Sequence, residues 1–206
     1  VVTMTEAKSA ALRRLAVRSR YSPDEATGTG TDQYCLAAVN SGARALTASG
    51  QHVMLGELIG RAVRDATLEA LRWQNGLEPS ETRGLFHALG WAGLSEATFL
   101  DDMAGRLTER ELELLRQNAK PVIYEPLVAA SAYAMAAVLD RVRYGTLPAS
   151  AAGEALHQQA ATMAASLAAK PENWYEFRNS FGRTEPERAR ELVLDALALG
   201  WSSKWK

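Results

Sequence analysis

The sequence changes character near Leu77, and this change constrains the fold more than any other feature. From Pro79 to Lys206 apolar residues recur at helical spacing, and no segment alternates as a strand does. Prolines fall at or near several of the proposed helix starts, where a missing amide costs little. We therefore predict two parts, residues 1–77 and an all-α region of residues 78–206.

Six helices are predicted in the second region, and one of them has a clear start signal. Thr108 and Glu111 have the spacing of a capping box, in which each side chain satisfies a backbone amide. The predicted helices are Glu81–Leu89, Thr108–Asn118, Pro126–Tyr144, Ala149–Ala169, Trp174–Phe181 and Glu185–Leu199.

The first region has short segments of strand character. These are Val1–Met4, Gln33–Val39 and Ala43–Ser49, the last two separated by the turn signal "NSG". We expect an α/β part of about three strands. Because so small a sheet has exposed edges, we expect another segment or another chain to complete it.

Two helices are predicted beside these strands. Thr3 and Glu6 have capping-box spacing at the start of the first one. The second is a long amphipathic helix from His52 to Gln74, and Gly76 ends its pattern.

Composition limits the classes of partner that we expect for this protein. The 206 residues carry 23 Lys and Arg against 24 Asp and Glu, a net charge of -1, so neither nucleic acid nor an anionic membrane is an expected partner. The longest strongly apolar stretch, Pro126–Leu139, is shorter than the ~20 residues that cross a bilayer.

Cys35 is the only cysteine, in an apolar run, and is interpreted as a reduced core thiol of a cytoplasmic protein. The three histidines lie in different elements without ligand spacing, so no metal site is predicted.

The stretch "TGTGTD", Thr27–Asp32, leaves two interpretations open. It lacks the spacing of a dinucleotide fingerprint and the Lys-Ser/Thr ending of a P-loop. Its alternating glycines can still expose backbone amides to an anion, and Asp32 can act as a general base. A plain turn with a capping aspartate explains it equally well. His52, at a helix start that keeps its ring neutral, is likewise either a base or a surface residue.

Three blocks together resemble the adenosylcobinamide amidohydrolase family: "TMTEAKSAAL", "ATGTGTD" and "SGQHVMLGELIGRAVRDATLEAL". The resemblance covers about residues 2–71 and is to the C-terminal half of that family. It implies hydrolysis of the amide that joins aminopropanol to adenosylcobinamide. The family has lysine where this chain has Gln51, and small or apolar residues in place of Gln33 and Tyr34.

The resemblance implies candidate site residues. The catalytic candidates are Asp32, His52, Glu57 and Thr31. The substrate-binding candidates are Glu6, Lys8, Thr27, Gly28, Thr29, Gly30 and Gly50. Gly56 and Gly60 also match family positions.

Amide hydrolysis needs a base for water, donors for the oxyanion and a proton for the leaving amine. Asp32 or Glu57 would activate water, the amides of Gly28 to Thr31 would receive the oxyanion, and His52 would protonate the amine. In a second scheme Thr29 or Thr31 is the nucleophile. No cofactor is expected, and cobalt would be present only within a corrinoid.

Two other functions stay open. One is a non-catalytic protein that binds a corrinoid or another bulky ligand. The other is one subunit of a heteromeric enzyme whose partner supplies the N-terminal half of the family. The expected partners are a small corrinoid-like substrate and either further copies of the chain or a second chain.

Overall fold

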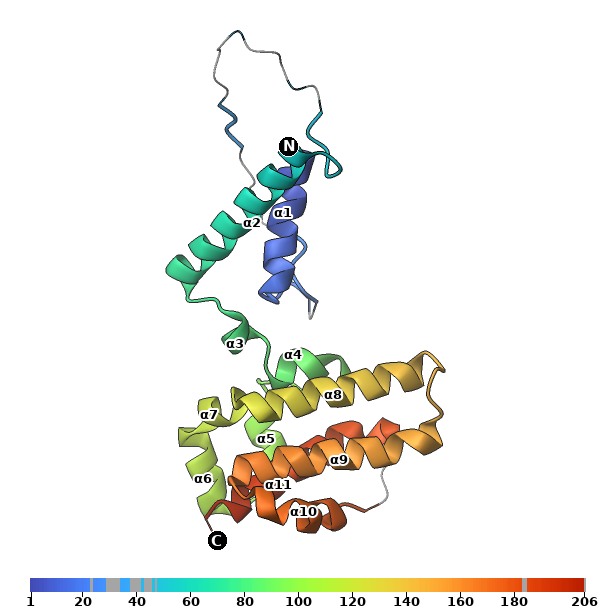
Figure 1. Cartoon of the computed structure of the whole chain (residues 1–206). Coiled ribbons are helices and arrows are strands. Elements are labelled where there is room, and N and C mark those ends of the chain that lie inside the picture. The colour runs from blue at the N-terminus through green and yellow to red at the C-terminus, as the bar shows by residue number, and fades with distance from the viewer. Residues whose placement is uncertain are drawn as a thin grey trace. The chain divides into compact units, whose positions relative to one another are not determined.

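The chain is helical in the computed structural model, which contains no strand among the residues it describes (Figure 1). The described residues are 1–22, 24–28, 34–37, 42, 46, 48–182 and 185–205. The chain divides into two compact units, Val1–Thr82 and Arg83–Lys206, which are treated separately below. The boundary predicted from the sequence lies after Leu77, five residues before the end of the first unit at Thr82. None of the described helices has the length and apolar character that crossing a membrane requires.

The predicted α/β character of the first region is wrong. Val1–Met4 is not a strand, because helix α1, Val2–Arg14, takes in Val2 to Met4. The good helix formers that follow, in "TEAKSAALRR", outweigh the β preference of three residues. Of the segments 33–39 and 43–49 the structure describes residues 34–37, 46, 48 and 49, and none of these is in a strand. The one extended pairing in the described part is an isolated antiparallel bridge between Arg18 and Glu25.

The first unit is built on α1 and the long helix α2, Met54–Asn75, followed by the short α3, Pro79–Thr82. The predicted long helix is thus confirmed, as is its end at Gly76. Gly76 has φ 66°, a left-handed conformation that suits glycine, and its amide donates to the Arg72 and Leu71 carbonyls. The predicted Thr3–Glu6 capping box is wrong, because the N-cap of α1 is Val1, whose side chain offers no acceptor.

Helices α1 and α2 pack against each other through small residues. Ala7, Ala11 and Leu12 are buried on α1, whereas the buried residue of α2 is Gly56. The larger apolar side chains of α2 are either half-buried, as Leu55, Ile59, Val63, Leu68 and Leu71 are, or exposed, as Met54, Leu58 and Trp73 are.

All the regular elements that the structure describes in the second unit are helices (Figure 1). Its α-helices are α4 (Leu85–Leu89), α5 (Phe99–Ala104), α6 (Glu109–Gln117), α7 (Ala119–Ile123), α8 (Pro126–Arg143), α9 (Ala149–Ala168), α10 (Trp174–Ser180) and α11 (Ala189–Ser203). The 3-10 turns are η1 (Gly90–Ala92), η2 (Pro171–Asn173) and η3 (Pro186–Arg188). The Thr108–Glu111 capping box is confirmed at the start of α6. The short helices α5 and α7 were not predicted.

Helix α9 packs against both α8 and α11 in this unit. Six of its alanines are fully or almost fully buried: Ala152, Ala160, Ala161, Ala164, Ala165 and Ala168. Helix α11 approaches so closely that a Cβ on Gly200 would lie 2.6 Å from the Ala164 carbonyl oxygen. Small side chains at this contact let the two backbones meet and exclude water.

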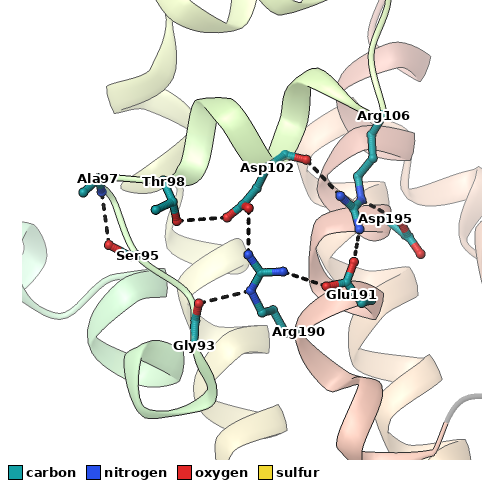
Figure 2. Close-up of polar contacts among 9 residues, drawn as sticks. All are labelled: Gly93, Ser95, Ala97, Thr98, Asp102, Arg106, Arg190, Glu191 and Asp195. Atoms are coloured by element: carbon teal, nitrogen blue, oxygen red, sulfur yellow. Dashed lines mark hydrogen bonds and ion pairs between the residues drawn. The ribbon is translucent and has the colours of Figure 1, made fainter.

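A network of charges ties α5 to α11 (Figure 2). Arg190 bonds to Asp102 at 2.7 Å, to Glu191 at 2.6 Å and to the Gly93 carbonyl at 3.1 Å. Arg106 contacts Glu191, and its Nε donates to Asp195 at 2.8 Å. Each guanidinium thus meets two carboxylates, and Glu191 is shared by both. Because these charged groups pair with one another within the unit, we assign the network a structural role.

The glycine at the α9–α11 contact gives a first prediction. Gly200→Ala places a Cβ against backbone atoms of α9, and overpacking of this kind costs about 1–3 kcal/mol. Thermal unfolding followed by circular dichroism should show a lower midpoint. Gly105→Ala is the control, because Gly105 has helical φ and ψ and open space around it. Equal midpoints for the two variants would contradict the close contact.

The charge network gives a second prediction, on the pH dependence of stability. Burial raises the pKa of Glu191, but the Arg190 hydrogen bond and the Arg106 charge lower it more, so the pKa in the folded state lies below the ordinary value. A lowered carboxyl pKa contributes stability above the unfolded-state pKa, and that stability is lost as the pH falls through the folded-state pKa.

Glu191→Gln should therefore cost stability at pH 7 and less at pH 3. The expected loss at pH 7 is at most about 1 kcal/mol, because the Glu191 side chain is 37% exposed and water screens it. Urea midpoints at both pH values measure this, with Glu187→Gln on the exposed η3 turn as the control. A loss that does not shrink at pH 3 would contradict the assignment.

Candidate functional site

Residues from separate parts of the first unit meet along α1. On one side, Thr3 Oγ1 donates to the Ser49 carbonyl at 3.2 Å, and Gln51 Nε2 donates to Glu6 Oε2 at 2.5 Å. Thr3 and Glu6 are three residues apart and so project on the same side of the helix. This side of α1 therefore holds the segment that leads into α2.

A neighbouring side of α1 holds the loop that carries "TGTGTD". The hydroxyls of Thr5 and Tyr34 share a hydrogen bond of 2.6 Å, and Ser9 Oγ donates to the Thr27 carbonyl at 2.9 Å. Lys8 Nζ lies 5.9 Å from the centroid of the Tyr34 ring, within the range of a cation–π contact. Both described ends of this loop stretch are thus fixed to one helix.

We call this set the α1 polar cluster. It consists of Thr3, Thr5, Glu6, Lys8, Ser9, Thr27, Tyr34, Ser49 and Gln51. It contains residues from each of the three sequence blocks, together with Tyr34, which follows the second block. Its contacts join residues up to 46 positions apart in the sequence.

The segment before α2 lies against its first turn at a glycine. A Cβ on Gly56 would lie 1.9 Å from the Gly50 carbonyl oxygen and 2.7 Å from that of Ser49. Only glycine leaves room for this approach. Gly56 therefore places Gly50 and Gln51 beside α1.

His52 and Glu57 lie close to this segment in the sequence, but neither is part of the α1 polar cluster. His52 is exposed in the turn before α2, and Glu57 is in the first turn of the helix. Glu57 forms an exposed ion pair with Arg61 at 3.7 Å. Glu6, Thr27, Gly28 and Gly50 are exposed and Lys8 is half-buried, so a ligand can reach the cluster.

Four candidates, Thr29, Gly30, Thr31 and Asp32, lie outside the described residues. Gln33 lies outside them as well, and the nearest described positions are Gly28 and Tyr34. Their roles stay predictions.

Sequence reasoning missed Thr5, Ser9 and Tyr34 as parts of the cluster. Tyr34 was noted only as a departure from the family. The available signal was its place directly after "TGTGTDQ", together with Thr5 and Ser9 at positions i and i+4 of one helix.

The interpretation of Cys35 as a buried core thiol is wrong. The residue is exposed, because the strand that would have buried it is not formed among the described residues. Within the described ranges, no three His, Cys, Asp or Glu side chains are grouped so that they would hold a metal ion.

The cluster brings polar groups of several kinds together on α1. Glu6 and Gln51 offer acceptors and donors, Lys8 adds one positive charge, and Tyr34 adds an aromatic face. Amide groups combine a donor with an acceptor, so a surface of this kind can bind them.

Comparisons with known proteins point to the same part of the chain. Residues 1–79 match the family described as adenosylcobinamide amidohydrolase, CbiZ. An uncharacterized protein from Methanocaldococcus jannaschii is 39% identical over 72 residues, which are 34% of this chain and 28% of that protein. The chain thus matches little more than a quarter of its relative's length. No solved structure matches.

The family match lies in the N-terminal part of this chain and extends somewhat beyond the expected residues 2–71. It does not support the expected correspondence to the C-terminal half of the family. The similarity of residues 1–79 to adenosylcobinamide amidohydrolases is the functional information that the comparisons supply.

Gly56 gives the prediction for this site. Gly56→Ala forces the 49–50 segment off α2, and we expect it to cost about 1–3 kcal/mol and to break the Thr3–Ser49 and Glu6–Gln51 contacts. Circular dichroism would measure the unfolding midpoint.

Gly60→Ala is the matched control in the same helix. Its Cβ would meet only the Thr3 methyl at 3.6 Å, an ordinary contact, and alanine favours the helix by up to ~1 kcal/mol. The account fails if Gly56→Ala is as stable as Gly60→Ala.

Proposed function

We propose that the first unit binds a corrinoid and hydrolyses an amide bond of its side arm, as an adenosylcobinamide amidohydrolase does. One observation carries the proposal: the α1 polar cluster joins, in space, the same three blocks that resemble this family in sequence. The family match over residues 1–79 supports it.

The reaction adds water across an amide, so that the C–N bond breaks into a carboxylic acid and an amine. In this proposal Asp32 or Glu57 activates the water, and His52 gives a proton to the leaving amine. Backbone amides from Gly28 to Thr31 stabilise the oxyanion, each worth about 3 kcal/mol. The cobalt ion belongs to the substrate.

The cluster has a positioning role in this scheme. Glu6 holds Gln51, the neighbour of His52, and Ser9 holds Thr27, the neighbour of Gly28. Lys8 lies beside Tyr34, and in this proposal it binds a carbonyl oxygen of the substrate. The scheme with Thr29 or Thr31 as nucleophile uses the same positioning contacts.

Two alternatives keep the site and change its use. In the first, the unit binds a corrinoid without hydrolysing it. In the second, it is one subunit of a heteromeric enzyme, and a partner chain supplies the rest of the family's sequence.

Turnover and binding distinguish these functions. Purified full chain is incubated with adenosylcobinamide, and adenosylcobyric acid and aminopropanol are measured by mass spectrometry, while binding is followed by calorimetry. Asp32→Asn and His52→Ala should keep binding and lose at least ~10²-fold in kcat, the lower end for acid–base residues. Lys8→Met should raise KM or Kd instead.

The control variants test the positioning contact. Gln51→Lys keeps a donor to Glu6 and should retain activity, whereas Gln51→Ala should lower it. Binding without turnover in the unmodified chain would favour the non-catalytic alternative. Absence of both, restored by a co-purifying protein, would favour the heteromeric one, and absence that nothing restores would refute the proposal.

A further inference from the structure

Tyr34 contacts two residues of α1 that lie one turn apart. Its hydroxyl shares a hydrogen bond of 2.6 Å with the Thr5 hydroxyl, and the Lys8 ammonium lies over its ring, with Nζ 5.9 Å from the ring centroid. Thr5 and Lys8 are at positions i and i+3, which are neighbours on the surface of a helix. The side chain of Tyr34 therefore bridges the two residues.

The two contacts use different parts of the Tyr34 side chain. The hydrogen bond holds the hydroxyl end of the ring on α1, and the face of the ring attracts the positive charge of Lys8. A ring that is fixed at its far end keeps its face beside the ammonium. The hydroxyl contact with Thr5 thus supports the ring contact with Lys8.

Lys8 depends on such a contact to keep its ammonium in one place, because a lysine side chain is a flexible four-carbon stem with a compact charge at its end. Ser9, the next residue, donates to the Thr27 carbonyl at 2.9 Å. An ammonium held beside Tyr34 therefore stays near the part of α1 that carries the loop. The ring needs no N–H group in return for its attraction, so this contact is compatible with donation from Lys8 to a carbonyl oxygen.

We propose that Tyr34 is a positioning residue, which holds the Lys8 ammonium where the substrate carbonyl binds and acts on the substrate through Lys8. The inference rests on the proposed function, and it names the residue that sets the geometry of one substrate contact.

A double-mutant cycle tests whether Tyr34 acts through Lys8. Calorimetry measures the Kd of the full chain for adenosylcobinamide. Tyr34→Leu removes the ring and should raise the Kd about 3- to 5-fold, the range of a cation–π contact. In a Lys8→Met background the same change should alter the Kd less than ~1.5-fold, because no ammonium is left to position. Equal effects in the two backgrounds would overturn the inference.

Conservative variants separate positioning from folding. Tyr34→Phe keeps the ring and loses the hydroxyl, so it should raise the Kd less than Tyr34→Leu does, and Thr5→Val should reproduce its effect. In turnover, Tyr34→Leu should raise KM and leave kcat nearly unchanged, as is expected for lost substrate binding. An effect on kcat alone would contradict a role through Lys8.

Tyr21 supplies the matched control. It is 91% exposed, and Arg20 lies 6.0 Å from its ring centroid, so it forms a cation–π pair of the same length outside the cluster. Tyr21→Leu should leave the Kd for adenosylcobinamide unchanged. A rise equal to that of Tyr34→Leu would show that the effect is not specific to the cluster.

A measurement without ligand distinguishes this inference from the proposed function. Lysines are labelled by reductive methylation with ¹³C, and the Lys8 resonance is assigned with Lys8→Arg. The ring current should shift this resonance upfield, and Tyr34→Leu should remove the shift whereas Tyr21→Leu should not. A Lys8 resonance that Tyr34→Leu leaves in place would overturn the inference, whether or not the chain binds a corrinoid. A shift that depends on Tyr34, in a chain that binds no adenosylcobinamide, would support the positioning of Lys8 and refute the proposed function.

Discussion

The candidate site depends on the close approach of the 49–50 segment to Gly56. A hydrogen atom in place of a side chain lets the Gly50 carbonyl lie against the first turn of α2. That contact sets where Gln51 and His52 leave the turn, and so whether Gln51 reaches Glu6 on α1. The remaining contacts of the cluster, from Thr5 and Ser9 to the loop, use the same helix.

The second unit also has a close approach of backbones at a glycine, and there it serves helix packing. Gly200 and the alanines of α9 bring helices into backbone contact, and the network of Arg106 and Arg190 holds α5 on α11. Its charges are used within the unit. We therefore place the candidate chemistry in the first unit.

Local signals predicted helices well and the fold of the first region poorly. The period of α2 and its end at Gly76 follow from spacing and from the left-handed turn that glycine permits. The Thr108 capping box is equally local. The strand predicted at Val1–Met4 was wrong because the run of strong helix formers that follows outweighs the β preference of Val1 and Val2. Cys35 was misplaced because its burial depended on a strand at residues 33–39, and the described positions 34–37 are not in a strand.

The site was predictable as three blocks and not as a set of contacts. Glu6, Lys8, Thr27 and Gly50 follow from the resemblance. That Glu6 meets Gln51, and Thr5 meets Tyr34, depends on how α1 packs, which no local pattern records.

Hydrogen–deuterium exchange of the full chain with and without adenosylcobinamide tests the central claim most directly, because it reads every backbone segment at once. The account predicts slower exchange, on adding the corrinoid, in peptides from residues 1–9, 24–37 and 48–53 together. Exchange in residues 83–206 should not change. Protection confined to the second unit, or to one block alone, would contradict a site built from the three blocks.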